Sequence, residues 1–429
     1  MIYHLFEHLQ KYDIPGQGLF QYLSFRAILA CLTALFIGIY AGKHIIRWMQ
    51  KKQIGEEIRD LGLEGQMQKK GTPTMGGIII YLAIVISVLL FSDLTNIYTI
   101  IMLLSTTAFF LIGFTDDYIK VFKHNKDGLS PKAKLLAQGI VGLAIALTVW
   151  LSPDIVIREK AAVNEPVTSI SSPELTVDSE LLVSPHESQD VVKSTKTTIP
   201  FVKSHEFDYK YLSPFKGAWG WYCKWGIYVL MIVLVIAACS NGVNLTDGMD
   251  GLAGGTSAIV GIVLGIFAWL GGNVVNSEYL NIMYIPGSGE IAVFMAAFVG
   301  ALIGFLWYNC FPAQVFMGDT GSLMLGGIIG VGAILIRKEL ILLILCGIFL
   351  AESLSVIIQR LYFRQTKKKY GEGRRVFRMA PLHHHYQKEG DFALIKSPKR
   401  AMPEAKIVLR FWIVGLMLAV VSIALLKIR

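Results

Sequence analysis

The sequence predicts an all-α integral membrane protein with about ten transmembrane helices, and three observations support this prediction. Of its 429 residues, 54% are hydrophobic and only 17% are charged, whereas soluble globular proteins carry about 25% charged residues. The apolar residues gather into segments close to the ~20 residues that a helix needs to cross a bilayer. Basic residues favour alternate loops. The segments cover residues 22–42, 75–92, 97–115, 135–151, 225–240, 251–271, 290–308, 321–336, 340–358 and 406–426.

Lysine and arginine residues predict the orientation of these helices, because loops rich in Lys and Arg stay in the cytoplasm. The stretches 43–72, 116–134 and 359–405 are basic, whereas 93–96 and 272–289 contain neither residue. The odd-numbered connections are therefore expected in the cytoplasm, with both termini outside. The net charge of +9 reports this topology and indicates no nucleic-acid partner. Four basic residues lie against the rule on the predicted outer side: Arg337, Lys338, Lys427 and Arg429.

The chain divides into three regions. Residues 1–151 contain the first four predicted helices with their cytoplasmic loops, and residues 223–429 contain the other six with the candidate active-site loops. Between them, residues 152–222 form a polar insert that the alternation places outside. From Ser152 to Pro200 the insert has no aromatic residue from which to build a core, so we expect it to be partly disordered.

The cysteines and the first residues argue against two other classes of protein. The five cysteines are scattered and lack CxxC spacing, so we interpret them as packing residues without a disulfide framework or zinc site. Residues 1–20 lack the basic start and apolar core of a secretory signal. The first apolar segment is therefore expected to stay in the membrane.

Carboxylates follow or precede two of the apolar segments. Asp116 and Asp117 end the third segment in the motif DDYIK, and Asp319 precedes the eighth in FMGDTGS. Adjacent carboxylates beside an apolar run are costly unless they are solvated, paired or bound to a cation. A solvated helix end would explain the pair, and a helix N-cap would explain Asp319. The functional alternative is a Mg²⁺ site, since Mg²⁺ prefers hard oxygen ligands together with substrate phosphates.

Three further polar motifs fall in predicted cytoplasmic loops. The loop 241–252 holds two Asn, two Asp and three Gly, and its glycines allow a ligand to approach the backbone. The run PLHHHY at 381–386 is poorly spaced for tetrahedral zinc, but imidazoles beside arginines suit a diphosphate. The motif KKGTPTMGG at 69–77 resembles an anion site at a helix start, although alone it is a weak signal and a basic inner helix end is the better explanation.

All five motifs fall on one predicted face, although the Asp, Asn, His and Gly positions were not used to assign the topology. Carboxylates, histidines and basic residues together indicate metal-assisted phosphate chemistry on a cytoplasmic substrate, with a membrane lipid as the second substrate. A transporter or channel would instead place its acids near helix midpoints.

The motifs KKGTPTMGG, DDYIK, NLTDGMDGL, FMGDTGS and MAPLHHHY, in this order, resemble those of the phospho-N-acetylmuramoyl-pentapeptide-transferase family. This family is part of the polyprenyl-phosphate N-acetylhexosamine-1-phosphate transferases. The resemblance covers nearly the whole chain except 152–222, which is longer than usual, and segment 366–375 is slightly extended. TPTMGG and PLHHHY are the motifs more specific to the muramoyl branch.

The resemblance implies a Mg²⁺-dependent transferase of the bacterial inner membrane, which acts as a homodimer. The implied reaction joins UDP-N-acetylmuramoyl-pentapeptide to undecaprenyl phosphate and gives lipid I and UMP. A sister enzyme that transfers GlcNAc-1-phosphate is the nearest alternative, and PLHHHY argues against it. Direct attack by the lipid phosphate and a two-step route through an aspartyl intermediate both fit the sequence.

Site residues are carried over from the family's motifs. Asp116 and Asp117 match catalytic positions, Asp116 being the one often given the role of deprotonating the lipid phosphate, and Asp319 matches the catalytic Mg²⁺ ligand. The catalytic set also includes the histidine motif near the phosphates, His383, His384 and His385. The positions that match the uracil site are Gly248, Met249, Asp250 and the stacking Phe316. Those that match other nucleotide-sugar contacts are Lys69, Thr74, Asn244, Asp247, Asn309 and Gln359.

Overall fold

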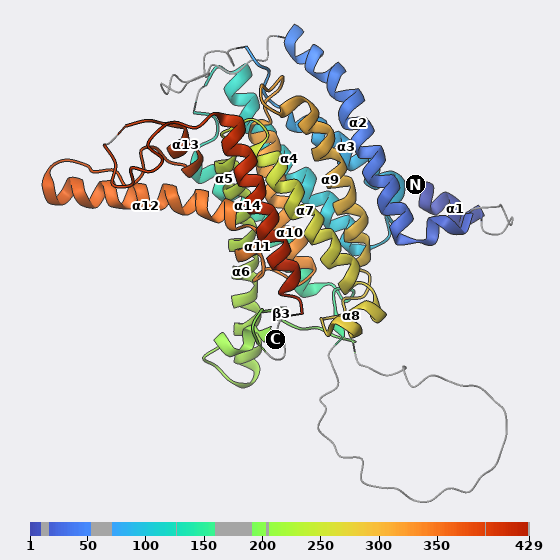
Figure 1. Ribbon diagram of the computed structural model, residues 1–429. Coiled ribbons are helices and arrows are strands. Elements are labelled where there is room, and N and C mark those ends of the chain that lie inside the picture. Colours follow the sequence, from blue (N-terminus) through green and yellow to red (C-terminus); the bar gives the residue numbers. More distant parts are fainter. Residues whose placement is uncertain are drawn as a thin grey trace, which may run out of the picture.

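The computed structural model describes residues 1–9, 17–52, 71–125, 127–158, 191–202, 206–390 and 392–427, which form a helical bundle (Figure 1). Within these residues, eight helices are long and apolar enough to cross a membrane, and α3 (Gly77–Phe91) is a shorter apolar helix. The prediction of an all-α integral membrane protein is confirmed. The eight are α2 (Leu23–Lys51), α4 (Ile97–Phe122), α5 (Pro131–Leu151), α6 (Gly217–Thr246), α7 (Leu252–Gly271), α9 (Gly289–Asn309), α10 (Gly318–Leu335) and α14 (Glu404–Ala424).

Helix α10 forms the centre of the bundle. It is the most deeply buried of the eight, followed by α9 and α7, whereas α2, α5 and α14 expose most of their surface. The exposed positions of the outer helices are largely aliphatic or aromatic, such as Phe36, Leu136 and Val420. An apolar exterior of this kind suits a lipid environment, where the helices need no aqueous face.

Glycines let α4 and α3 approach the buried helix α10. A Cβ atom on Gly113 of α4 would clash with the Asp319 carbonyl oxygen, and one on Gly77 of α3 would clash with the backbone of Gly321. Small residues permit such close backbone contact between membrane helices. The crossing at Gly113 places the end of α4 beside the start of α10.

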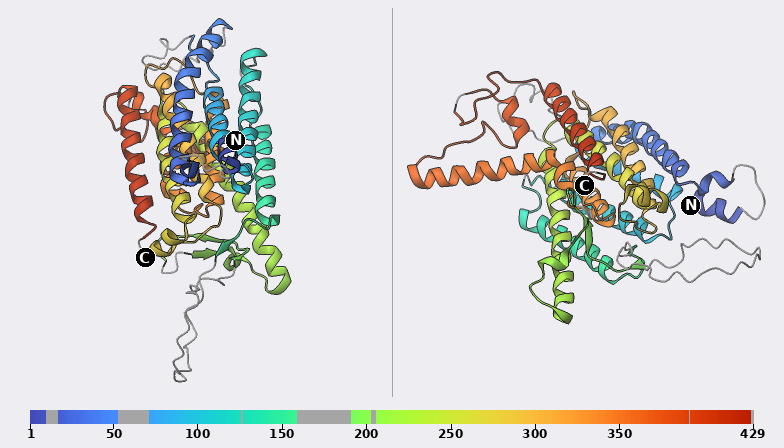
Figure 2. Two further views of the ribbon diagram at one scale, coloured as in Figure 1. Left: turned by 90° about the vertical axis from the view of Figure 1, so that its right-hand side faces the viewer. Right: turned by 60° about the horizontal axis from the view of Figure 1, so that its bottom comes forward.

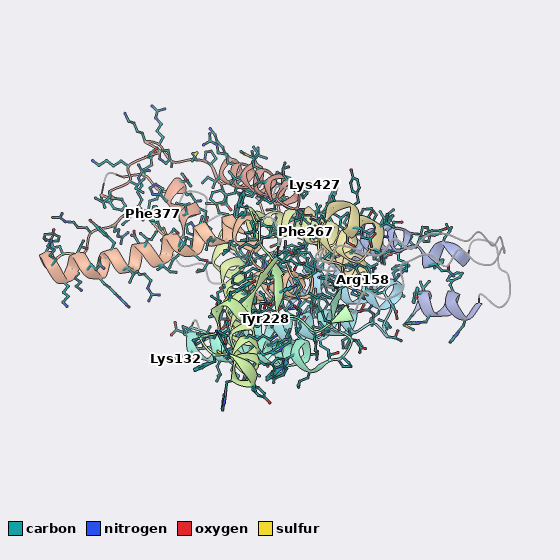
Figure 3. The ribbon with its side chains drawn as sticks, turned by 90° about the horizontal axis from the view of Figure 1, so that it is seen from below. Lys132, Arg158, Tyr228, Phe267, Phe377 and Lys427 are labelled. Carbon is teal, nitrogen blue, oxygen red and sulfur yellow. The ribbon has the colours of Figure 1, made fainter. Side chains whose placement is uncertain are left out.

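The ninth predicted segment, 340–358, is not one helix. It is broken at Cys346 into α11 (Leu342–Leu345) and α12 (Gly347–Tyr370), and α12 projects sideways from the bundle (Figures 1 and 2). Seen from below, Phe377 lies out beside α12, far from Tyr228 and Phe267 in the bundle (Figure 3). The short helix α13 (Leu382–Gln387) follows and carries the three histidines.

The opposite end of the bundle carries the C-terminus, helix α8 (Val274–Leu280) and strand β3 (Lys196–Thr198), whereas α13 lies toward the other end (Figure 1). At the N-terminus, α1 (Ile2–Leu9) and the 3₁₀ helix η2 (Gln17–Gln21) precede α2. The number of helices that cross the membrane and the side that faces the cytoplasm stay predictions.

The described part of the insert is ordered around two small antiparallel sheets. Strand β1 (Ile157–Arg158) pairs with β2 (Val191–Val192), and β3 pairs with β4 (Glu206–Asp208). The 3₁₀ helix η4 (Tyr209–Leu212) follows, and α6 begins at Gly217, so the predicted insert 152–222 includes the first turns of a transmembrane helix. Because the first turns of α6 contain Trp and Lys residues, they were not recognised as part of an apolar segment. The expectation of disorder falls mainly on 159–190, which lies outside the described residues.

The strand β3 also explains two of the basic residues that violated the charge rule. Arg337 and Lys338 are almost fully buried beneath it. The Lys338 ammonium donates to the Thr198 hydroxyl at 2.6 Å, and the Arg337 guanidinium donates to the Tyr228 hydroxyl. Charges that are buried and hydrogen-bonded in this way are structural, and they say little about topology.

Candidate functional site

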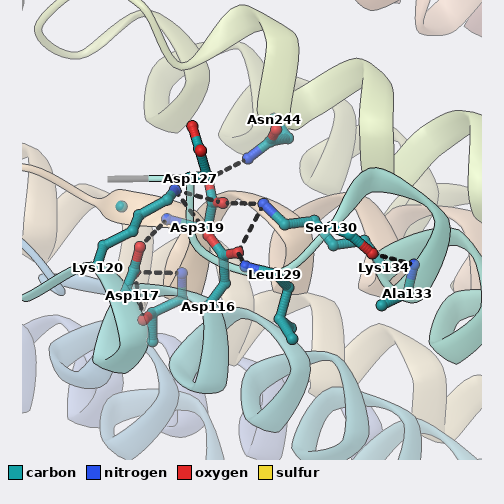
Figure 4. Close-up of polar contacts among 12 residues, drawn as sticks. Asp116, Asp117, Lys120, Asp127, Leu129, Ser130, Ala133, Lys134, Asn244 and Asp319 are labelled. Carbon is teal, nitrogen blue, oxygen red and sulfur yellow. Dashed lines mark hydrogen bonds and ion pairs between the residues drawn. The ribbon is translucent and has the colours of Figure 1, made fainter. Parts of the chain in front are cut away.

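Three carboxylates from two helices meet at the predicted active end. Asp116 and Asp117 lie in the last turns of α4, and Asp319 lies in the first turn of α10. Each offers an oxygen, and these oxygens lie within 4.8 Å of one another (Figure 4). Asp116 and Asp117 are buried and Asp319 is partly buried. The two sequence motifs, 200 residues apart, therefore form one centre.

Two lysines neutralise most of this negative charge. Lys120 Nζ lies 2.6 Å from Asp116 Oδ2 and 2.9 Å from Asp319 Oδ2. Lys134 Nζ, from the start of α5, lies 3.0 Å from Asp116 Oδ1 and 2.6 Å from Asp319 Oδ2. Neither lysine was predicted as a site residue. Lys120 could have been found from its i,i+4 spacing to Asp116, whereas nothing in the sequence distinguishes Lys134 from its basic neighbours.

Asp117 has a different environment from Asp116. Its Oδ2 atom accepts hydrogen bonds from the Thr320 backbone N–H at 2.8 Å and from the Thr320 hydroxyl at 2.6 Å. Its Oδ1 atom accepts from the Asp319 N–H at 3.2 Å. Asp117 therefore caps the N-terminus of α10 from another helix, although the sequence suggested Asp319 itself as a cap.

Asn244 connects the carboxylate centre to helix α6. Its amide nitrogen donates to Asp319 Oδ1 at 2.6 Å and lies 2.9 Å from the Ser322 hydroxyl. Four residues later, a Cβ atom on Gly248 would clash with His383 Nε2. The loop after α6 thus lies between the carboxylate centre and the histidine helix α13.

The three predicted histidines have three different environments. His383 is fully buried against Glu352 of α12, with Nδ1 3.2 Å from Glu352 Oε2. His384 is partly exposed, and its ring centroid lies 4.2 Å from that of His383. His385 is buried, and both of its ring nitrogens are bonded to the loop backbone. The sequence could not distinguish them.

The bonds of His385 define its protonation state. Nδ1 accepts from the Arg378 N–H at 3.1 Å, so Nε2 donates to the Ser397 carbonyl at 2.8 Å. Burial lowers the pKa of His385, which the Ser397 carbonyl opposes and the Arg378 charge assists. The Arg378 side chain is itself buried and donates to the carbonyls of Lys388 and Lys396. Both residues therefore hold the loop together, and Arg378 is not available to a phosphate here.

Other predicted contact residues also bond to the backbone. Gln359 accepts from the N–H groups of Val376 and Phe377, both at 3.0 Å, and donates to the Phe377 carbonyl. Asn309 accepts from the Gly251 N–H at 3.0 Å and donates to the Val315 carbonyl at 2.9 Å. These amides shape the loops around the centre.

The remaining predicted residues are distributed around the same loops. Asp250 Oδ2 accepts from the Ala313 N–H at 3.0 Å, and Met249 is buried in a small cluster with residues of α14. Thr74 is buried beside Gly318, and Phe316 pairs its backbone with residues 73 and 76. Asp247 caps the C-terminus of α6. Lys69 lies outside the described residues.

The carboxylate centre has the donor set of a divalent-cation site. Its groups are hard carboxylate oxygens on close, buried positions, without a cysteine or histidine among them. Such oxygen sites suit Mg²⁺, which typically uses one or two carboxylates and completes its coordination with water and phosphate. The three carboxylates could therefore hold a divalent cation, and Lys120 and Lys134 pair with two of them.

A membrane-embedded helical bundle that presents clustered carboxylates and lysines at one end defines a class of integral membrane enzyme for phosphorylated substrates. The profile of glycosyl transferase family 4 matches residues 191–337, and phospho-N-acetylmuramoyl-pentapeptide-transferase signature 1 matches residues 69–80. Relatives named phospho-N-acetylmuramoyl-pentapeptide-transferase align over 100% of this chain and 100% of their own length. They are from Parabacteroides distasonis (53% identical), Flavobacterium psychrophilum (51%) and Porphyromonas gingivalis (49%).

The chain belongs to the phospho-N-acetylmuramoyl-pentapeptide-transferase family. It is a multi-pass protein of the bacterial inner membrane. Because the alignments span both chains in full, the insert 152–222 lies within a length that these relatives share.

Proposed function

We propose that this protein transfers phospho-N-acetylmuramoyl-pentapeptide from its UDP-linked donor to undecaprenyl phosphate, giving lipid I and UMP for peptidoglycan synthesis. The proposal rests on the relatives that are named for this transfer, whose sequences are 49–53% identical to this chain over its full length. The carboxylate and lysine centre at one end of the bundle supports it, since a lipid phosphate and a soluble nucleotide can meet there.

In the reaction, an oxygen of the lipid phosphate bonds to the phosphorus next to the sugar, and the bond from that phosphorus to the bridging oxygen breaks. UMP leaves with the bridging oxygen. A phosphate dianion is already nucleophilic, so the protein mainly needs to position the groups and stabilise charge. Lys120 and Lys134 are placed to pair with phosphate oxygens once the carboxylates bind a cation.

We further propose Asp116, Asp117 and Asp319 as the residues that hold Mg²⁺, with Asp319 as the principal ligand. When bound, Mg²⁺ would neutralise charge on the diphosphate as UMP leaves. Asn244 orients Asp319, and Asp117 orients the helix turn that carries it. The cytoplasmic position of the centre and a homodimeric assembly also belong to this proposal.

The test measures UMP release by the purified protein with UDP-N-acetylmuramoyl-pentapeptide, undecaprenyl phosphate and Mg²⁺. We expect UMP release that depends on the lipid, that EDTA abolishes and that added Mg²⁺ restores. The Asp319→Ala variant should show no release. Asp154→Ala is the matched control, because it removes an exposed carboxylate near the opposite end of α5. Activity with UDP-GlcNAc instead would identify the sister transferase, and activity with neither donor would refute the enzyme assignment.

A further inference from the structure

Glu352 is a fully buried carboxylate on α12, close to the break that separates it from α11. Within the described residues its side chain meets one polar partner, His383. The His383 N–H lies 3.2 Å from Oε1 and 3.4 Å from Oε2, and the His383 ring atom Nδ1 lies 3.2 Å from Oε2. Burying a carboxylate is costly unless a charged or donating group compensates it, so this pairing needs a reason.

The pairing fixes which ring nitrogen of His383 faces the substrate loop. A lone pair on Nδ1 would repel the carboxylate, so Nδ1 carries a hydrogen. Neither ring nitrogen of His383 makes a hydrogen bond within the described residues: Nδ1 faces the Glu352 carboxylate as an ion-pair contact, and Nε2 is buried. It lies against Gly248, where a Cβ atom would clash with it. The unpartnered nitrogen is therefore directed at the loop that Asn244 joins to Asp319.

His383 is the only one of the three histidines with this arrangement. Both nitrogens of His385 are bonded to the backbone, and Nδ1 of His384 lies 3.2 Å from the Gln387 side chain. A carboxylate behind a histidine fixes the orientation of its ring. The Glu352 carboxylate therefore keeps Nε2 of His383 facing the substrate loop.

We propose that Glu352 is a positioning residue for the transfer. It holds His383 through the backbone N–H and the ion-pair contact with Nδ1, so that Nε2 faces an anionic oxygen of the donor's diphosphate. This inference rests on the proposed function, because the anion is the diphosphate of UDP-N-acetylmuramoyl-pentapeptide. It assigns a role to a residue that no sequence motif indicated.

A double-mutant cycle tests whether Glu352 acts through His383. Glu352→Gln keeps the shape and removes the charge, and we expect kcat/KM to fall about 10- to 100-fold. In a His383→Asn background the same change should alter kcat/KM less than about 2-fold. Ser355→Ala is the matched control, since Ser355 is a buried polar residue one turn further along α12. Equal losses in both backgrounds, or no loss in Glu352→Gln, would overturn the inference.

The affinity for the donor separates this role from a packing role. Binding of UDP-N-acetylmuramoyl-pentapeptide, measured calorimetrically, should weaken about 10-fold or more in Glu352→Gln. Glu352→Asp retains the charge and should bind the donor nearly as the wild type does. Equal weakening in both variants would contradict the proposal.

Two controls keep the result interpretable. If Glu352→Gln does not fold, as judged by thermal melting in detergent, Glu352→Asp should still bind the donor nearly as the wild type does, and a weakened affinity in a folded Glu352→Asp would count against the proposal. If the wild-type protein neither binds nor turns over the donor, the proposed function fails. If the wild type is active and Glu352→Gln matches it, only the role of Glu352 fails.

Discussion

Asp117 and Thr320 join α4 to the first turn of α10, because one carboxylate oxygen of Asp117 accepts both the N–H and the hydroxyl of Thr320, at 2.8 and 2.6 Å. The first N–H groups of a helix have no partner within it, and negative charge at that end is favourable. The contact therefore orients the turn on which Asp319 lies.

Thr320→Val should disturb this cap while preserving side-chain volume. Thr320 is fully buried, so the loss of a hydrogen bond to a charged group should destabilise the protein by about 1.5–3 kcal/mol. A lower melting temperature and a reduced kcat would report it. Thr320→Ser keeps the hydroxyl and should retain most of both, and a Val variant as stable as the wild type would show that the backbone bonds suffice.

Gly113→Ala should separate α4 from α10. The added methyl group would meet the Asp319 carbonyl oxygen, and a backbone atom cannot move aside as a flexible side chain can. We expect nearly complete loss of UMP release. Gly139→Ala on α5, where a Cβ has no neighbour within 4 Å, is the control and should remain active. Full activity of Gly113→Ala would show that the two helices can separate without disturbing the site.

Lys134→Met should reveal the role of the lysine that the sequence did not single out. We expect kcat to fall about 10²- to 10³-fold, as for removal of a preorganised electrostatic group. Because the lysine no longer pairs with Asp319, the Mg²⁺ concentration for half-maximal activity should decrease. Lys132→Met changes an exposed lysine on the same turn of α5 and should match the wild type. An increased Mg²⁺ requirement in Lys134→Met would refute this explanation.

The loop around His385 should be sensitive to acid. Its folded pKa is below the usual 6.5 because of burial, so the unfolded loop binds a proton at a higher pH than the folded loop. The stability of the folded loop is then complete above about pH 6.5 and is lost as pH falls through the folded pKa. Hydrogen exchange of residues 376–397 should show less protection at about pH 5.5 than at about pH 8, after correction for intrinsic rates.

His385→Gln provides the comparison for that measurement. It removes the titrating ring, so the difference in protection between the two pH values should become small. If the wild-type loop is equally protected at both, the lowered pKa of His385 has no consequence for the stability of the loop.

Most helices could be predicted because each apolar run must match the thickness of a bilayer. The helix ends could not, because they are polar or aromatic and leave the lipid. Helix α6 starts eight residues before its apolar segment, and α12 continues twelve residues beyond its own, to Tyr370. The break at Cys346 was also hidden, since its neighbours are apolar and the sequence shows no interruption.

The candidate site was predicted in part. The motifs of Asp116, Asp117 and Asp319 indicated one centre, and the structure brings all three together. Lys134 was missed because it is one lysine among basic neighbours. Glu352 was missed although it is the only charged residue of the predicted apolar segment 340–358, a position that by itself suggests a function. Gln359 and Asn309 were predicted to contact the nucleotide sugar and His385 to be catalytic, but their polar atoms bond to the loop backbone. These roles stay predictions.

The sequence by itself determined the membrane class, the family and the residues of the acidic motifs, since hydrophobic length and short motifs are local properties of the chain. Only the tertiary structure decided how α4 crosses α10 at Gly113, which lysines neutralise the carboxylates, and which histidine has a carboxylate behind it. These relations depend on contacts between residues far apart in the sequence, and the close packing of side chains and backbone in three dimensions fixes them.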